Sequence, residues 1–251
     1  MVRIGFILIV LQGFLAFHGF AQTEVGDGEP SIVYRSDQAF GGGFYAKGYF
    51  LDYHYGKRIT ATLNQKFYGS FSNLRHQKET KSFNPFFKDA RGYYFGKLNA
   101  FWQLKLGYGF QKIITPKLQK HGVAISASFL GGVSLGMLKP VYLEIIKEQF
   151  VDSVSQGVLV TEQYTGVQGR EVIYGRAPWF MGIGEMKFQP GVFVRQEFEF
   201  EYSAYKETIQ SITAGMELQY YPSEIEIMTM TENSRIFARL FIGFKIGNRK
   251  K

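Results

Sequence analysis

A strict alternation of residue types between positions 235 and 247 constrains the fold more than any other feature of this sequence. The positions between its apolar residues include Arg235, Arg239 and Lys245. Successive side chains of a β-strand point to opposite faces, so the segment predicts a strand with one apolar and one charged face. The apolar face consists of Ile236, Ala238, Leu240, Ile242, Phe244 and Ile246. One such strand fits a soluble sandwich or a membrane barrel, and the rest of the chain decides between them.

The first residues predict export. Arg3 precedes an apolar run over residues 4–15, and Gly19-Phe20-Ala21 places small residues where a signal peptidase reads them. Residues 1–21 are therefore expected to be a cleaved signal, with residues 22–251 forming one domain. No other apolar run reaches the length of a membrane helix, so an exported chain that enters a membrane does so as strands. We expect the bacterial outer membrane; a soluble periplasmic or secreted protein is the alternative.

The same alternation recurs along the chain and predicts an all-β fold, a transmembrane antiparallel up-and-down β-barrel of eight strands. The connections alternate between short and long, so with both termini in the periplasm the long ones become extracellular loops. Ten strands are the alternative, because short strands are possible at 142–146, 157–160 and 171–174. The eight strands are expected at residues 35–46, 49–55, 60–71, 93–111, 123–137, 190–202, 208–221 and 235–247.

Charges of both signs lie on the polar faces of these strands. An eight-stranded barrel has a narrow interior that side chains can fill, and buried charges are costly unless they are paired. We therefore expect an internal network of ion pairs that plugs the barrel rather than a pore. Its members are expected to be Lys66, Lys97, Lys105, Arg195, Glu197, Glu199, Glu201, Glu217, Arg235, Arg239 and Lys245.

The net charge of +8 points to anionic partners. In an exported protein these are phosphate groups of outer-membrane lipid and glycolipid rather than nucleic acid. The loop at residues 72–92 concentrates basic and aromatic residues, and a merely solvated loop is the alternative. The residues expected to contact glycolipid are Arg75, Lys78, Lys81, Lys88 and Arg91.

The longest connection, residues 138–189, is rich in aromatic and aliphatic residues. Loops of that length without function are uncommon, so we expect an ordered lid. Trp179 and Phe180 are the best candidates for contact with another outer-membrane protein, and packing beneath the lid or at the membrane boundary is the alternative.

The sequence contains little that indicates a catalytic site or a metal site. His54 with Ser126 or Ser128 is a conceivable hydrolase pair, but all three fall on the inward face without a nucleophile elbow. His76 and Glu79 are three residues apart and lack further metal ligands. We therefore expect no enzyme, no cofactor and no metal site.

Several short motifs together resemble a family of small outer-membrane β-barrel proteins from the Bacteroidota, over residues 34–250. The resemblance implies the location and fold but no activity or catalytic residues. The final strand departs from the general barrel sorting signal, which favours Gly where this chain has Phe241. The motifs are Asn84-Pro85-Phe86-Phe87, Tyr94-Phe95-Gly96-Lys97-Leu98-Asn99, Gly131-Gly132-Val133-Ser134-Leu135-Gly136, Lys139-Pro140-Val141-Tyr142-Leu143, Tyr174-Gly175-Arg176-Ala177-Pro178 and Tyr221-Pro222.

These features favour a non-enzymatic barrel with a structural or protein-interaction role, as an accessory subunit of an envelope assembly or secretion complex. The alternative is a small channel or solute-binding barrel.

Overall fold

The computed structural model describes residues 34–87, 90–117, 122–151, 154–205, 207–229 and 231–250. The predicted signal at residues 1–21 lies outside the described residues. No helix among the described residues is long and apolar enough to cross a membrane.

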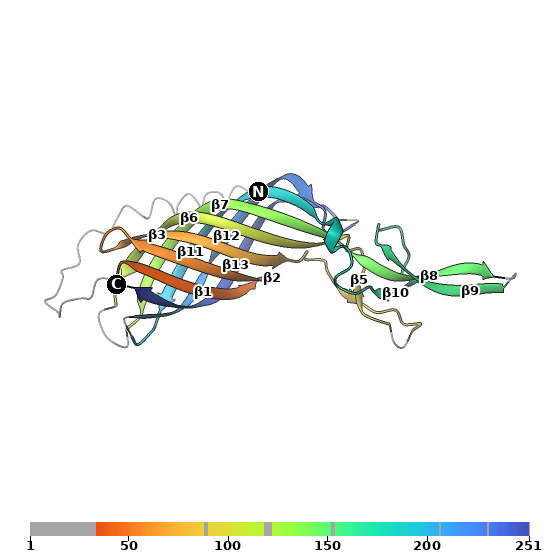
Figure 1. Cartoon of the computed structure of the whole chain (residues 1–251), viewed down its shortest axis with the longest axis horizontal. Helices are drawn as coiled ribbons and strands as arrows, with labels where there is room; N and C mark the ends of the chain where they lie inside the picture. Colours follow the sequence, from red (N-terminus) through yellow and green to blue (C-terminus); the bar gives the residue numbers. More distant parts are fainter. Residues whose placement is uncertain are drawn as a thin grey trace, which may run out of the picture. The chain divides into compact units, whose positions relative to one another are not determined.

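Eight antiparallel strands form a closed barrel (Figure 1). Each strand pairs with its neighbour along the chain, and β1 pairs with β13 to close the sheet. The predicted eight-stranded up-and-down barrel is therefore confirmed, and the ten-stranded alternative is wrong. The strands are β1 (Ser36–Tyr45), β2 (Gly48–Arg58), β3 (Leu63–Leu74), β6 (Asn99–Thr115), β7 (Ala124–Pro140), β11 (Lys187–Glu201), β12 (Thr208–Ile225) and β13 (Ser234–Lys250).

The two ends of the barrel differ in their connections. At one end, here called the turn end, short connections join β2 to β3 and β11 to β12, and β1 begins beside the last residues of β13. At the opposite end, the loop end, long connections join β3 to β6 and β7 to β11. This is the alternation that the sequence predicted.

The long connections hold their own secondary structure. The β7–β11 connection contains β8 (Tyr142–Val151), β9 (Val154–Gln163), β10 (Ile173–Arg176) and the 3-10 helix η2 (Ile183–Glu185). Strands β10, β8 and β9 form a separate three-stranded sheet, which is why the short strands predicted there do not enlarge the barrel. The β3–β6 connection contributes a two-stranded sheet of β4 (Lys81–Ser82) and β5 (Tyr93–Tyr94).

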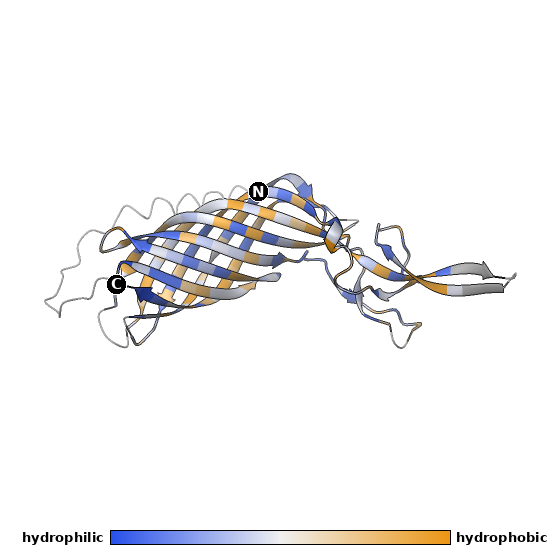
Figure 2. Cartoon of the chain, in the orientation of Figure 1, coloured by the Kyte–Doolittle hydropathy of each residue, from blue (hydrophilic) through white to orange (hydrophobic). Residues whose placement is uncertain are grey.

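The outward face of the barrel is apolar on all eight strands. Figure 2 shows apolar and polar residues alternating along each barrel strand. Soluble monomers rarely expose contiguous apolar surface on this scale. Outward side chains with more than half of their surface exposed include Phe40, Phe44, Leu51, Leu106, Val133, Val192, Leu240 and Ile242.

Small residues on the inward face give large side chains room to cross the interior. A Cβ at Gly136 of β7 would lie 2.7 Å from the ring of Phe101, and one at Gly191 of β11 would lie 2.6 Å from the ring of Tyr221. Such distances are too short for packed carbon atoms. Both glycines therefore accommodate inward-pointing rings of other strands.

Candidate functional site

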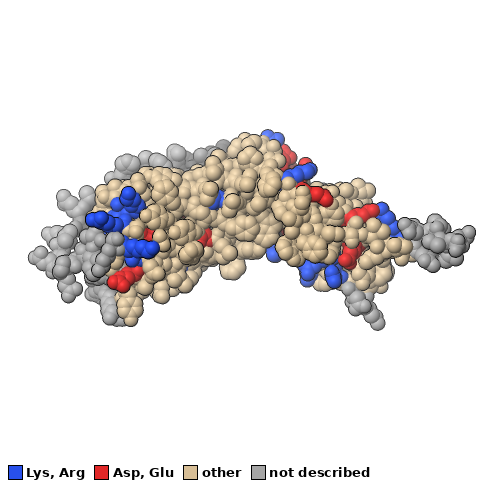
Figure 3. Space-filling view, viewed as in Figure 1, with Lys and Arg blue, Asp and Glu red and all other residues tan. Residues whose placement is uncertain are grey.

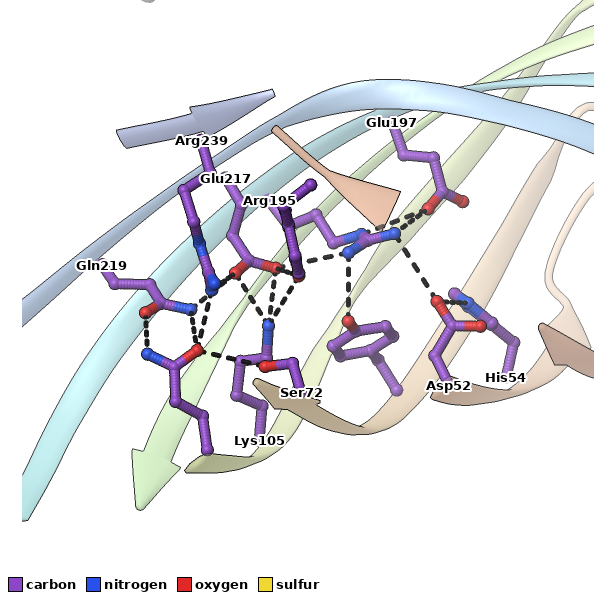
Figure 4. A network of polar contacts seen from close by, with 12 residues as sticks. Asp52, His54, Ser72, Lys105, Arg195, Glu197, Glu217, Gln219 and Arg239 are labelled. Carbon is purple, nitrogen blue, oxygen red and sulfur yellow. Dashed lines mark hydrogen bonds and ion pairs between the residues drawn. The ribbon is translucent and has the colours of Figure 1, made fainter. Parts of the chain in front are cut away.

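Arg195 of β11 is the centre of a buried charge network (Figure 4). Its guanidinium is fully buried and forms ion pairs with Glu197 at 2.9 Å, Glu217 at 3.3 Å and Asp52 at 3.5 Å. It also donates a hydrogen bond to the Tyr68 hydroxyl at 3.2 Å. These partners lie on β2, β3, β11 and β12, so a single side chain links four strands through the interior.

Glu217 of β12 is the main acceptor in the network. Besides Arg195, it accepts hydrogen bonds from Lys105 Nζ at 2.7 and 2.9 Å, Arg239 Nη2 at 2.8 Å and the Tyr45 hydroxyl at 3.1 Å. A buried carboxylate is tolerated only when such donors replace its water shell. The arrangement therefore requires β1, β6, β11, β12 and β13 to be in register at the same time.

A second group of charges lies closer to the turn end. Lys66 donates to Glu199 at 3.0 Å, and Lys245 forms ion pairs with Glu197 and, at 3.5 Å, with Glu199. Gln111 also donates to Glu199, at 3.1 Å. Because Glu197 pairs with both Arg195 and Lys245, the two groups form one continuous network.

Aromatic side chains fill the space around the charges. The Arg195 guanidinium carbon lies 3.6 Å from the centre of the Phe241 ring and 4.9 Å from that of Phe50, distances at which a cation is attracted to the ring. Phe241 is thus an inward-facing member of the interior, at the position where the general sorting signal favours Gly. Tyr68, Leu130 and Phe193 form a further buried cluster.

The lumen at the loop end is filled by apolar side chains. The cluster combines barrel residues with two residues of the β12–β13 connection, Ile227 and Met228, and among the side chains that the structure describes it includes none from β8, β9 or β10. The sheet in residues 138–189 is therefore not the source of these buried side chains, although it was expected to act as a lid. The barrel members are Leu74, Phe101, Leu138, Tyr221 and Ile225.

Most of the predicted interior charges meet in this network. Lys66, Lys105, Arg195, Glu197, Glu199, Glu217, Arg239 and Lys245 all take part. Glu201 is partly buried near the turn end and pairs with Arg249, which the sequence analysis did not single out. Tyr45, Tyr68 and Asp52 also belong to the network; their signal in the sequence was the inward parity of their positions.

Two predicted members lie elsewhere. Lys97 precedes β6 and pairs with Glu79 of the β3–β6 connection at 2.7 Å. Arg235 is exposed at the start of β13 and pairs with Glu224 at 3.3 Å, where both side chains are 55% exposed. Arg235 is therefore not an interior residue, and Lys97 is buried but pairs outside the network, because alternation identifies the face of a strand but not where along it the lumen ends.

The residues considered for catalysis, all of which the structure describes, are not joined to one another by hydrogen bonds. His54 Nε2 lies 3.3 Å from Asp52 Oδ2, next to Arg195 (Figure 4). Ser126 accepts a hydrogen bond from Gln111 at 2.7 Å. Among the described residues, no hydrogen bond joins His54 to Ser126 or Ser128, and no group of three His, Cys, Asp or Glu residues is placed to hold a metal ion.

The described residues in the ranges 75–98 and 141–186 form what we call the loop module. Its core is a cluster of five buried residues from both connections, including Tyr93 of β5 and Ile145 of β8. The Asn84 amide donates to the Ile173 carbonyl oxygen at 2.6 Å, and the rings of Phe87 and Tyr174 lie 5.3 Å apart. The two long connections therefore form one folded unit.

The segment between β10 and β11 is held against the end of β7. Lys139 Nζ donates to the carbonyl oxygens of Trp179 at 2.6 Å and Met181 at 2.7 Å. The Tyr142 hydroxyl donates to the Glu185 carboxylate, and this hydrogen bond raises the pKa of Tyr142. Several residues of the motifs quoted above, among them Asn84, Lys139 and Tyr142, thus make contacts that order the loops.

The residues predicted to contact partners lie on the surface of this end. The side chains of Trp179 and Phe180 are 77% and 58% exposed, although their backbone is held in place. The predicted glycolipid contacts are also exposed, except Lys88, which lies outside the described residues; they are Arg75, Lys78, Lys81 and Arg91. Lys81 Nζ lies 5.0 Å from the centre of the Phe83 ring, so a cation and an aromatic surface are side by side.

Fold and interior together define the class of this molecule: a closed eight-stranded antiparallel β-barrel with an apolar outer wall and a filled lumen. No protein-family model and no curated protein matches the chain. Among solved structures it is similar to Neisserial surface protein A, with 9% identity over 86% of this chain and 94% of that chain and a TM-score of 0.37. It is also similar to the N-terminal β-barrel domain of Pseudomonas aeruginosa OprF, with 9% identity, coverage of 86% and 97%, and a TM-score of 0.35. The class follows from the strand topology of the chain itself.

Proposed function

We propose that this protein is a non-enzymatic integral barrel of the bacterial outer membrane with a structural or protein-interaction role. Its loop end faces the cell exterior, and it acts as an accessory subunit of an envelope assembly or secretion complex. The single observation that carries the proposal is the combination of a filled lumen with an ordered, surface-exposed loop module.

The membrane location is supported by the outer wall of the barrel. Outward positions on all eight strands carry exposed apolar side chains, while charged side chains are buried inside. The hydrocarbon core of a membrane offers no hydrogen-bond partners. A closed barrel suits it because the barrel satisfies its backbone hydrogen bonds internally and presents apolar side chains to the lipid. The predicted export signal and the resemblance to Bacteroidota barrels agree with it.

The filled lumen favours a structural role over transport. Arg195, Lys105, Glu197 and Glu217 are at most 1% exposed, and apolar side chains occupy the loop end. An ion crossing this interior would have to displace paired charges whose separation costs several kcal/mol. The same burial argues against catalysis by His54, which is 2% exposed.

A protein partner is supported by the exposed aromatic pair Trp179 and Phe180. An ordered backbone lowers the entropic cost of binding, and large aromatic side chains are common anchors of interfaces. The test is a photo-crosslinker at position 179 in intact cells, with position 167 as control because Val167 is 88% exposed in the same connection. A discrete heavier species from position 179 alone supports the proposal; only glycolipid or intramolecular adducts would remove it.

We also propose that the basic face of the β3–β6 connection contacts glycolipid phosphates. Exposed Arg75, Lys78, Lys81 and Arg91 lie on this connection together with the exposed rings of Phe83 and Phe86. Replacing these four residues and Lys88 with glutamine should lower the amount of glycolipid that copurifies with the barrel and raise membrane permeability. Unchanged glycolipid and permeability would mean that the loop is merely solvated.

A further inference from the structure

The outward face of β2, β1 and β13 changes character toward the turn end. Phe40 of β1 is paired in register with Tyr53 of β2 and Ile246 of β13, and all three are exposed. Two residues further along each strand, Gln38 is paired with Tyr55 and Asn248. On β1 and β13 an apolar side chain is thus followed by an amide side chain, while β2 has a tyrosine in both rows.

The next outward row is basic. Ser36 of β1 is paired with Lys57 of β2 on one side and with Lys250 of β13 on the other. Residues paired across strands point to the same face, and neighbouring strands lie about 4.8 Å apart, so the two lysines flank the serine at about 5 Å on each side. Both lysines are exposed, and their ammonium groups are able to converge on one ligand over the serine hydroxyl.

No carboxylate on these three strands faces outward to neutralise the row. The acidic residues of β1 and β2 are Asp37 and Asp52, both at inward positions, and β13 contains none. Figure 3 shows several basic side chains, with fewer acidic atoms beside them, near the end of the barrel where β1 begins and β13 ends. The outward surface here therefore attracts anions.

The spacing of these rows matches the distance from the acyl chains to the headgroup phosphate of one phospholipid. Phe40 lies four positions after Ser36, which corresponds to about 13 Å along the strand and about 10 Å along the axis of a tilted barrel. Hydrocarbon chains would lie along Phe40, Tyr53 and Ile246, and a headgroup phosphate would lie at the level of the lysines. The polar row between them falls at the ester region of the lipid.

We infer that Lys57, Ser36 and Lys250 form a binding site for the phosphate of an anionic phospholipid in the leaflet on the turn-end side. This inference rests on the proposed membrane location. It concerns the leaflet opposite the proposed glycolipid contacts and a different set of strands. The site anchors the seam where the first and last strands close the barrel.

The test is native mass spectrometry of the full-length barrel released from detergent with added phosphatidylglycerol or phosphatidylcholine. Wild type should retain phosphatidylglycerol preferentially. Each lysine near a phosphate contributes enough attraction to change affinity about fivefold, so the double variant Lys57→Gln with Lys250→Gln should bind about 25-fold more weakly. Millimolar inorganic phosphate should not displace the lipid, because the acyl chains contribute to binding.

The matched control is Lys47→Gln with Lys187→Gln, which removes two exposed lysines at the loop end. Equal losses in both double variants, or equal retention of both lipids by wild type, would overturn the site, and displacement by inorganic phosphate would reassign it to a free anion. Retained heat-dependent gel mobility in the Lys57 and Lys250 variant shows that the barrel is intact. Wild type that fails to enter bilayers would instead contradict the proposed membrane location.

Discussion

At the scale of single residues, the interior of this barrel depends on charges that compensate one another. Arg195 has three carboxylate partners, and Glu217 accepts from five residues: Tyr45, Lys105, Arg195, Gln219 and Arg239. Replacing an entire buried ion network by apolar residues is often neutral, whereas removing one member leaves the others unpaired. Replacing a single member of the network should therefore lower the free energy of unfolding by more than that member's average share of the network's stabilisation.

We expect Arg195→Met to lower the free energy of unfolding by about 3–5 kcal/mol, since Glu197, Asp52 and Glu217 lose a shared partner. Urea titration of the detergent-solubilised barrel would measure the change. The control is Arg235→Met, which removes an exposed pair with Glu224 and should change stability by less than about 1 kcal/mol. Equal effects of the two substitutions would contradict the role of Arg195.

At the scale of elements, the long connections are folded rather than loose. The core of the loop module combines residues from both connections, and the Asn84 amide joins the β4–β5 region to β10. Backbone carbonyls that lose a buried donor are costly, so this one hydrogen bond contributes to the order of two segments distant in sequence. Asn84 and Ile173 both lie outside the strands of the barrel.

Asn84→Ala should therefore make the loop module more sensitive to protease without weakening the barrel. The expected cost is about 1–3 kcal/mol of local stability, because the Ile173 carbonyl loses its buried donor. Limited proteolysis, followed by gel analysis of the protected barrel fragment, would measure the effect. Gln77→Ala, an exposed residue of the same connection, serves as control; equal cleavage of both variants would refute the role of Asn84.

At the scale of the whole molecule, closure of the sheet determines how the barrel resists unfolding. β1 and β13 pair continuously from Ser36 with Lys250 to Tyr45 with Phe241, so no edge remains in the barrel sheet. Detergent has no free strand at which to begin separating the sheet, and the ion pairs inside link strands on opposite sides. The barrel should unfold only when many strands separate together.

Heated and unheated samples should consequently migrate differently on a denaturing gel, because the closed barrel stays compact in detergent until it is boiled. The measurement needs only the purified full chain at two temperatures. Identical mobility, together with recovery in the soluble periplasmic fraction, would contradict the membrane location.

Reconstituted wild-type protein should show no stepwise ion conductance in planar bilayers, since paired charges and aromatic rings occupy the lumen. Single-channel recording is the measurement, with empty bilayers and a known porin as controls. Regular conductance steps would favour the alternative of a small channel.

The sequence by itself determined the strand number, the order of long and short connections and the identity of most inward charges. The reason is geometric: side chains alternate between two faces of a strand, so the parity of Lys105 or Glu217 follows from its own segment. The same parity predicted the apolar outer wall at Leu240 and Ile242, which the structure confirms.

Only the tertiary structure decided which charges meet and where the lumen ends. Glu217 finds Lys105, 112 positions away, because closure of the sheet brings β6 and β12 to face each other across the interior. Arg235 has the correct parity but is exposed at the start of β13, and Lys97 is buried but precedes β6 and pairs with Glu79 of a long connection. Likewise, Asn84 and Ile173 meet only because two loops share one core. Alternation is a local property, whereas register, depth and loop packing arise from contacts between segments distant in sequence.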